Sequence, residues 1–359
     1  MKRLCLACVV LLFGHRAAFP ADEKNAEGFR LALPGYSYQF PRDHAAHPEF
    51  RTEWWYFTGH LAAKNHPGAK FGYELTFFRD ALSAKPVSPQ SAWSLRDIFF
   101  AHFALTDLKR RTFWSAEKIN RGALGLAGAD AKHLHVWVED WTLEDAPAGW
   151  KLKAQEDDRQ LDLVVKPMKR EVIHGANGIS QKAPERGRAT HYVSFTRLHT
   201  EGVIRSGRES WNVEGESWFD HEFGSNQLSP DEAGWDWFSL QFDSGEELMI
   251  YLLRKKNGCF EISSSGTWIA RDGSATHLNI EDISVLSRAT WKSPHTQAVY
   301  PAVWEIRIPK FKVDVTVDPL LPDQELMVKQ SANTSYWEGA CQVRGSHSGK
   351  AYVELTGYK

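Results

Sequence analysis

Tight-turn signals separate apolar runs at regular intervals between Asp236 and Asp282, and they restrict the fold more than any other feature of the chain. The run "WDWFSLQF" leads to Asp-Ser-Gly at 243–245, "ELMIYLLR" to Lys-Asn-Gly at 256–258, and "CFEISSSGTWIA" to Arg-Asp-Gly at 271–273. Asn-Gly and Asp-Gly between apolar runs are strong hairpin signals, because both turn residues need positive φ. Successive hairpins form an antiparallel meander, which must close or protect its edges.

The first half of the chain repeats this pattern. The runs "TEWWYFTGHLAA" and "KFGYELTFFRD" flank a turn at 65–68, and "RDIFFAHFALTDL" and "RTFWSAEKI" flank a turn at 109–110. Helical periodicity is weak, apart from the N-terminal leader. The sequence therefore predicts an all-β protein with two antiparallel meanders of similar length, joined near residues 211–224, that fold as barrels or sandwiches.

Aromatic and polar side chains mix on both faces of the expected strands. Glu53 and Trp55 share one face of the first strand, and Tyr56 lies on the other face. A barrel whose lumen mixes aromatic and polar groups can hold one small apolar ligand. A sandwich with aromatic residues scattered over its outer face is the alternative.

The N-terminus has the pattern of a secretory signal peptide. Lys2 and Arg3 precede a short apolar run at 4–13, and small residues follow near 17–21. That run is too short to span a bilayer. We therefore expect residues 1–21 to be removed and the mature protein to be periplasmic or secreted; a buried N-terminal helix is the alternative. Export would leave Cys259 and Cys341, as a disulfide or as free thiols.

Composition argues against a nucleic-acid partner. The formal net charge is −2 over 359 residues, with neither a basic stripe nor an acidic tail. This length allows one large domain or two medium ones. The 15 tryptophans can line a cavity as well as fill a core.

Four stretches together resemble one family, AttH/CrtC, whose members are often labelled predicted secreted hydrolases. They are "HPEFRTEWWYFTGHL" with "GYELTFFR", "VEGESWFDHEFG", "GWDWFSLQFDSGEELMIYLLRKKNG", and the C-terminal pair "YWEGACQVRG" and "AYVELTGY". The resemblance runs from about His47 to the C-terminus. It implies two tandem lipocalin-like β-barrels, which we place at 47–222 and 223–359.

The resemblance also implies a type of function. The characterised branch is the carotenoid 1,2-hydratases, which add water to a terminal isoprenoid double bond. The sequence is closer to the AttH branch, whose members often lie beside ABC-type export systems. We expect an apolar isoprenoid or lipid-like ligand that is hydrated or otherwise modified. The alternatives are a non-catalytic carrier working with an ABC-type transporter, and a scaffold whose barrels are filled by side chains.

Hydrolysis and metal catalysis have weak support in the sequence. The stretch Gly215 to Phe219 fails the G-x-S-x-G pattern at its last position, and neither late cysteine has a histidine nearby. His133 and His135 share a face of an expected strand and could bind zinc with a third ligand. Two exposed strand histidines are the favoured interpretation. The sequence thus predicts no metal and no cofactor.

Hydration of an alkene needs a protonated acid, aromatic faces that stabilise a carbocation, and a group that directs water. The stretch "WFDHEFG" holds these types: Asp220 as the acid, His221 as its partner or the base, and Trp218 as the ring. Asp236, between Trp235 and Trp237, offers a second cluster. The predicted catalytic residues are therefore Asp220, His221 and Asp236.

The family resemblance supports His221, which falls in the W-x-D-H-x-x-G segment shared with the hydratases. The resemblance implies that the hydratases use an aspartate on the strand after "GWDW", where this chain has the apolar "MIYLL" at 249–253. Proton delivery would then fall to Asp220, Asp236 or Asp243.

A structural role is the alternative for these residues. "WFDHEFG" could link the two barrels through buried hydrogen bonds. Glu53 needs a partner, and Arg79 on the neighbouring strand is the obvious one. Trp337 and Glu338 are interpreted as structural. The expected ligand-binding residues are Glu53, Trp55, Tyr56, Trp218, Trp235 and Trp237.

Overall fold

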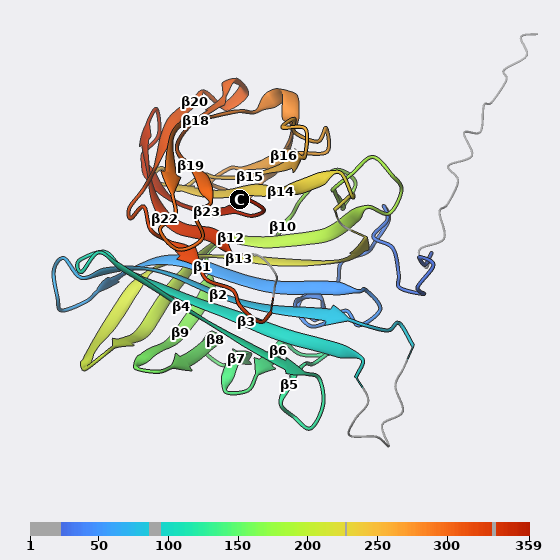
Figure 1. Ribbon diagram of the computed structural model, residues 1–359, viewed down its shortest axis with the longest axis horizontal. Helices are drawn as coiled ribbons and strands as arrows, with labels where there is room; N and C mark the ends of the chain where they lie inside the picture. The colour runs from blue at the N-terminus through green and yellow to red at the C-terminus, as the bar shows by residue number, and fades with distance from the viewer. Residues whose placement is uncertain (1–22, 86–94, 227, 332–334) are drawn as a thin grey trace, which may run out of the picture.

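The computed structural model describes residues 23–85, 95–226, 228–331 and 335–359, so the expected signal peptide at 1–21 lies outside the described residues. The described chain is all-β and forms two antiparallel sheets, one a nearly closed barrel and the other a half-barrel (Figure 1). The predicted fold class, two tandem β-barrels, is confirmed. No helix among the described residues is long and apolar enough to cross a membrane.

The first sheet has the order β4-β3-β2-β1-β13-β12-β9-β8-β7-β6-β5, with β10 and β11 pairing with β12. Its strands are β1 (Thr52–Ala63), β2 (Lys70–Ala81), β3 (Asp97–Asp107), β4 (Thr112–Arg121), β5 (Ala127–Ala129), β6 (His135–Val138), β7 (Trp141–Ala146), β8 (Gly149–Glu156), β9 (Arg159–Pro167), β10 (Val172–Ile173), β11 (Ser180–Gln181), β12 (Ala189–Ser206) and β13 (Glu209–Asn226). Most neighbours in the order are also neighbours in sequence, as a meander requires.

The second sheet has the order β17-β16-β15-β14-β23-β22-β20-β19-β18, and β21 pairs with β22. Its strands are β14 (Glu232–Phe242), β15 (Glu247–Lys255), β16 (Ser265–Ile269), β17 (Ala275–Asn279), β18 (Ser284–Lys292), β19 (Val299–Ile308), β20 (Val313–Pro319), β21 (Glu325–Leu326), β22 (Tyr336–Gly345) and β23 (Gly349–Leu355). Short 3₁₀ turns are η1 (Arg42–His44), η2 (Ile280–Asp282) and η3 (Pro309–Phe311). The turns at 243–245 and 256–258 join consecutive strands, as predicted: Gly245 and Gly258 both have positive φ.

The stretch "WFDHEFG" lies inside β13, an inner strand of the first sheet that pairs with β1 and β12. The connection to the second sheet follows later, after β13 ends at Asn226 and before β14 begins at Glu232. Residues 211–224 are therefore not the joint that the sequence suggested. Alternation along the strand turns Phe219 and His221 into the barrel and Asp220 toward the second sheet.

Packed side chains, rather than open space, fill the first barrel. Trp55, Phe57, Trp141 and Phe219 are fully buried in one hydrophobic cluster there. The half-barrel has its own cluster around Trp304. The ligand cavity that we expected in a barrel lumen lies instead between the two sheets.

A third cluster fills the contact between the sheets, where β1, β12 and β13 face β14, β15, β22 and β23 (Figure 1). Its members include Tyr56, Tyr192, Trp218, Trp237 and Tyr352. This arrangement explains why aromatic residues occur on both faces of one strand. One face packs into a barrel, and the other packs against the neighbouring sheet.

Neither late cysteine is in a disulfide among the described residues. Cys259 is exposed and Cys341 is buried, and both thiols are free. The alternative of two buried free thiols is therefore correct in that both thiols are free, but it is wrong about the burial of Cys259.

Candidate functional site

A cavity of about 360 Å³ lies between the outer faces of the two sheets. Its wall combines aromatic rings with ionisable groups, a combination typical of ligand sites. The rings include Trp54, Tyr56, Trp235, Trp237, Tyr251 and Tyr336. The carboxyl groups are those of Glu53, Glu74, Asp80, Asp220, Glu222, Glu338 and Glu354, beside the cationic groups of Arg79 and Lys182.

Burial raises the pKa of several of these carboxyl groups, so that they can hold a proton near neutral pH. Burial raises the pKa of Glu354 to about 7, although bonds from the side chains of Trp235 and Thr356 act against it. Burial and the nearby Glu354 raise the pKa of Glu74, and the same two causes raise that of Glu338 well above its usual value. Perturbed acids in a cavity are typical of catalytic sites.

Glu74 and Glu338 each present an oxygen that lacks a hydrogen-bond partner among the described residues. Oε1 of Glu74 accepts bonds from Thr76 Oγ1 at 2.7 Å and from the Tyr336 hydroxyl at 3.4 Å. Oε1 of Glu338 accepts a bond of 2.5 Å from the Tyr56 hydroxyl. The two Oε2 atoms are buried and unpaired. A buried polar atom left unpaired beside a cavity needs an explanation, such as a bound water or ligand.

Asp220 lines the same cavity, but three side chains already bond its carboxyl group. The Tyr192 hydroxyl donates to Oδ2 at 2.6 Å, and Trp218 Nε1 donates to Oδ1 at 2.6 Å. The Ser194 hydroxyl also donates to Oδ1. Burial raises the pKa of Asp220 to about 7. Asp220 thus fixes Tyr192, whose hydroxyl also accepts a bond from Trp237 Nε1 at 3.0 Å.

Lys182 supplies a buried positive charge at the cavity wall. Its Nζ lies 2.6 Å from Glu222 Oε1 and 4.3 Å from the centre of the Tyr251 ring. Burial opposes the charge of Lys182, but Glu222 and Tyr251 outweigh it and raise the pKa of the amine. Glu222 is therefore committed to an ion pair.

A chain of hydrogen bonds connects Glu74 with the partly exposed Glu117. Ser331 Oγ donates to Glu117 Oε2 at 2.6 Å and lies 2.8 Å from His102 Nε2. His102 Nδ1 lies 2.7 Å from the Tyr336 hydroxyl, which reaches Glu74. Burial lowers the pKa of His102 to about 4, so this imidazole is neutral at pH 7.

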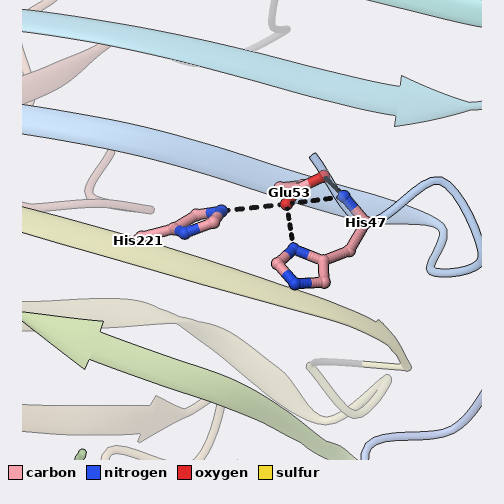
Figure 2. Close-up of side chains that lie close together, drawn as sticks. All are labelled: His47, Glu53 and His221. Atoms are coloured by element: carbon pink, nitrogen blue, oxygen red, sulfur yellow. Dashed lines mark hydrogen bonds and ion pairs between the residues drawn. The ribbon is translucent and has the colours of Figure 1, made fainter. Parts of the chain in front are cut away.

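His221 lies on the other face of β13, away from Asp220. Its Nε2 is 2.9 Å from Glu53 Oε1 (Figure 2). Its Nδ1 is 3.1 Å from the backbone oxygen of Asp43. Burial lowers the pKa of His221 to about 4. Glu53 Oε1 also lies 2.8 Å from His47 Nδ1. Burial opposes a charge on His47, but Asp43 and Glu53 outweigh it and raise its pKa.

The other predicted residues divide between the cavity and the cores. Trp235, Trp237 and Tyr56 line the cavity, and Trp218 reaches it through Asp220. Trp55 is buried in the barrel core.

Two of the predicted acids are committed to other partners. The carboxyl group of Asp236 bonds Arg254 Nε at 2.8 Å and the Tyr358 hydroxyl at 2.9 Å. Glu53 borders the cavity, and its carboxylate bonds Arg79 at 3.3 Å, as predicted, besides the two histidines.

Sequence reasoning did not select Glu74, Glu354 or Lys182, and it interpreted Glu338 as structural. One signal was available. Each of these glutamates interrupts an aromatic or apolar strand, in "GYELTFF", "YWEGAC" and "AYVELT". Such residues need a partner or a function when the strand is buried on both faces.

Comparison with known proteins supports one family. The family described as AttH-like matches residues 31–358. The solved structure of an AttH protein from Nitrosomonas europaea is 32% identical, with a TM-score of 0.82, over 91% of this chain and 99% of that one. Kievitone hydratase from Nectria haematococca is 14% identical, with a TM-score of 0.66, over 94% and 96% of the two chains, and shows a similar fold. No curated protein sequence matches the chain.

Proposed function

Because the chain belongs to the AttH-like family, we propose that it is an exported hydratase that adds water to a carbon–carbon double bond of an isoprenoid or lipid-like molecule. One observation carries the proposal: buried acids with raised pKa values stand among aromatic rings in one cavity. Kievitone hydratase, a relative in fold, bears a name that fits this chemistry.

The proton donor in this proposal is Glu74. Its carboxyl proton passes to one alkene carbon, and the electron pair of the double bond forms the new C–H bond. The positive charge on the second carbon faces the cavity rings, whose negative π faces stabilise cations. The oxygen of a water molecule then bonds to that carbon, and the water's surplus proton goes to a carboxylate, which balances the addition.

Two groups of side chains complete the cycle. Glu338 and Glu354 lie together at the wall, and Glu354, when ionised, accepts the proton of the attacking water. The path through Tyr336, His102 and Ser331 supplies Glu74 with a new proton. Asp220 is a positioning residue in this scheme, because it holds Tyr192 against Trp237.

The size of the cavity limits what it holds. A volume of about 360 Å³ lies near the lower end of the range for small-molecule sites. It suits a short molecule or the unsaturated end of a longer chain.

A carrier that works with an ABC-type export system is the alternative function. Cavity volume alone would serve a carrier. Seven carboxyl groups in the wall argue against it, because burying acids costs free energy and adds no affinity for a hydrocarbon.

Product analysis tests the proposal. The mature protein is incubated with a mixture of acyclic isoprenoids and unsaturated lipids, and extracts are analysed by mass spectrometry beside the Glu74→Gln variant. A product heavier by one water that the variant does not form supports hydration. Unchanged ligand recovered with both proteins would support the carrier instead. Glu325→Gln is the matched control, because Glu325 is buried and hydrogen-bonded but does not line the cavity.

A further inference from the structure

Three potential metal-binding atoms converge inside the end of the first barrel. His47 Nδ1, Glu53 Oε1 and His221 Nε2 all lie within 4.8 Å of one another (Figure 2). They come from the segment before β1, from β1 and from β13. The three side chains are 0–1% exposed. The fold thus brings three ligands of two types that transition metals use, imidazole and carboxylate, to one buried point.

The remaining ring nitrogens are oriented by a single residue, Asp43. His47 Nε2 lies 3.4 Å from Asp43 Oδ1, and His221 Nδ1 lies 3.1 Å from the Asp43 backbone oxygen. A backbone oxygen only accepts, so His221 Nδ1 carries the proton and, in a neutral ring, Nε2 offers its lone pair to the centre of the cluster. Metal-binding histidines are typically oriented in this way, by a carboxylate or carbonyl on the far nitrogen.

Aromatic stacking holds both imidazoles in place. The ring of Phe223 stacks on His47 at 3.6 Å between centres and 9° between planes. The ring of Trp55 stacks on His221 at 5.0 Å and 20°. Arg79 donates to Oε2 of Glu53, and the backbone N–H of His47 is shared between Oε2 at 2.9 Å and Oε1 at 3.1 Å, which holds the carboxylate with Oε1 directed at the two imidazole rings. The ligand atoms are therefore pre-positioned.

We infer that His47, Glu53 and His221 bind a divalent transition-metal ion, with zinc as the best match. Two imidazoles and one carboxylate form the donor set of known zinc sites, whereas Ca²⁺ and Mg²⁺ prefer oxygen ligands. Bonds of about 2.0–2.1 Å to zinc require the atom pairs now at 2.8 and 2.9 Å to separate by only a few tenths of an ångström. The ion joins the segment before β1 to β13.

This inference does not rest on the proposed function, because His221 and the cavity-lining Asp220 lie on opposite faces of β13. Its test is elemental analysis of the full chain, purified without chelators and without a metal-affinity column. We expect about one zinc-class ion per chain. Stripping the ion with a chelator should lower Tm, and added zinc should restore it. Glu53→Gln and His221→Gln should lose the ion, whereas the double variant His133→Gln/His135→Gln should keep it.

A zinc titration of stripped wild type, read by competition with a chromophoric chelator, keeps the inference testable if the variants do not fold. Saturable binding of one equivalent supports it. Metal-free protein as purified, no uptake of zinc and an unchanged Tm would overturn it. That result would show that hydrogen bonds alone hold the cluster together.

Discussion

Glu338 on β22 and Glu354 on β23 occupy directly opposed positions of neighbouring strands, on the face of the second sheet that borders the cavity. Two negative charges at such positions repel each other, and burial adds to the cost. The fold tolerates the pair because at least one of the two carboxyl groups keeps its proton. The pair therefore lowers the stability of the fold, and it keeps a carboxylic proton at the cavity wall.

The first prediction concerns the contribution of Glu354 to the pH dependence of the free energy of unfolding. Burial raises its folded pKa to about 7, above the ordinary value of 4.5, so the folded state binds more protons than the unfolded state between these values. Stability from this group is therefore full below pH 4.5 and falls as pH rises to 7, by about 3 kcal/mol in total. The variant Glu354→Gln should lose this dependence.

Urea unfolding at pH 5 and pH 8, with wild type and variant side by side, measures the difference. The free energy of unfolding of the variant, relative to that of wild type, should be higher at pH 8 than at pH 5. Equal pH dependence of the two proteins would show that Glu354 titrates normally.

The second prediction separates the acids of the cavity by role. Glu74→Gln keeps the shape of the side chain but removes the acidic proton, so hydration should slow by about 10²–10⁴-fold. Asp220→Asn should lower stability more than it lowers the rate per folded molecule, since Asp220 is already bonded by three side chains. Single-turnover rates and thermal unfolding distinguish the two effects. A larger rate loss in Asp220→Asn than in Glu74→Gln would indicate that Asp220, and not Glu74, is the proton donor.

The third prediction is the pH profile of hydration. The proton donor acts in its protonated form, and burial raises the pKa of Glu74 above its ordinary value. The rate should therefore pass through a maximum, falling on the alkaline side as Glu74 ionises and on the acidic side as the proton acceptor Glu354, whose pKa burial raises to about 7, becomes protonated. A profile of kcat against pH, limited to the range in which the protein stays folded, checks this. A rate that rises with pH instead would point to a carboxylate acting as the rate-limiting base.

The sequence predicted the fold well and the site in part, for physical reasons. Turn residues such as Gly258 act locally, so the hairpins could be inferred from short stretches. Asp220 and the pair Trp235 and Trp237 were predicted as two separate clusters, and the structure brings them to one cavity because they lie on strands whose outer faces meet. The sequence analysis assigned His221 and Asp220 to one cluster because they are adjacent, although strand alternation sends their side chains to opposite faces.

The acids of the cavity were harder to find. Glu74, Glu338 and Glu354 come from β2, β22 and β23, and only the packing of one sheet on the other brings them together. Likewise, His47 and Glu53 join His221 only when the segment before β1 folds over the barrel end. No local pattern encodes such long-range contacts.

The last prediction tests the proton path with two tyrosines that differ in hydrogen bonding. The Tyr336 hydroxyl lies 2.7 Å from His102 Nδ1 and 3.4 Å from Glu74, whereas the buried Tyr352 hydroxyl has no partner among the described residues. Tyr336→Phe should lower the free energy of unfolding by about 1–3 kcal/mol, because it leaves Nδ1 of His102 without a hydrogen-bond partner. It should also slow turnover, because it interrupts the supply of protons to Glu74. Tyr352→Phe should leave stability unchanged or raise it. Urea unfolding and steady-state rates of the two variants give the comparison. A slower second turnover with a normal first one in Tyr336→Phe would locate the defect in reprotonation, whereas equal rates in the two variants would exclude this path.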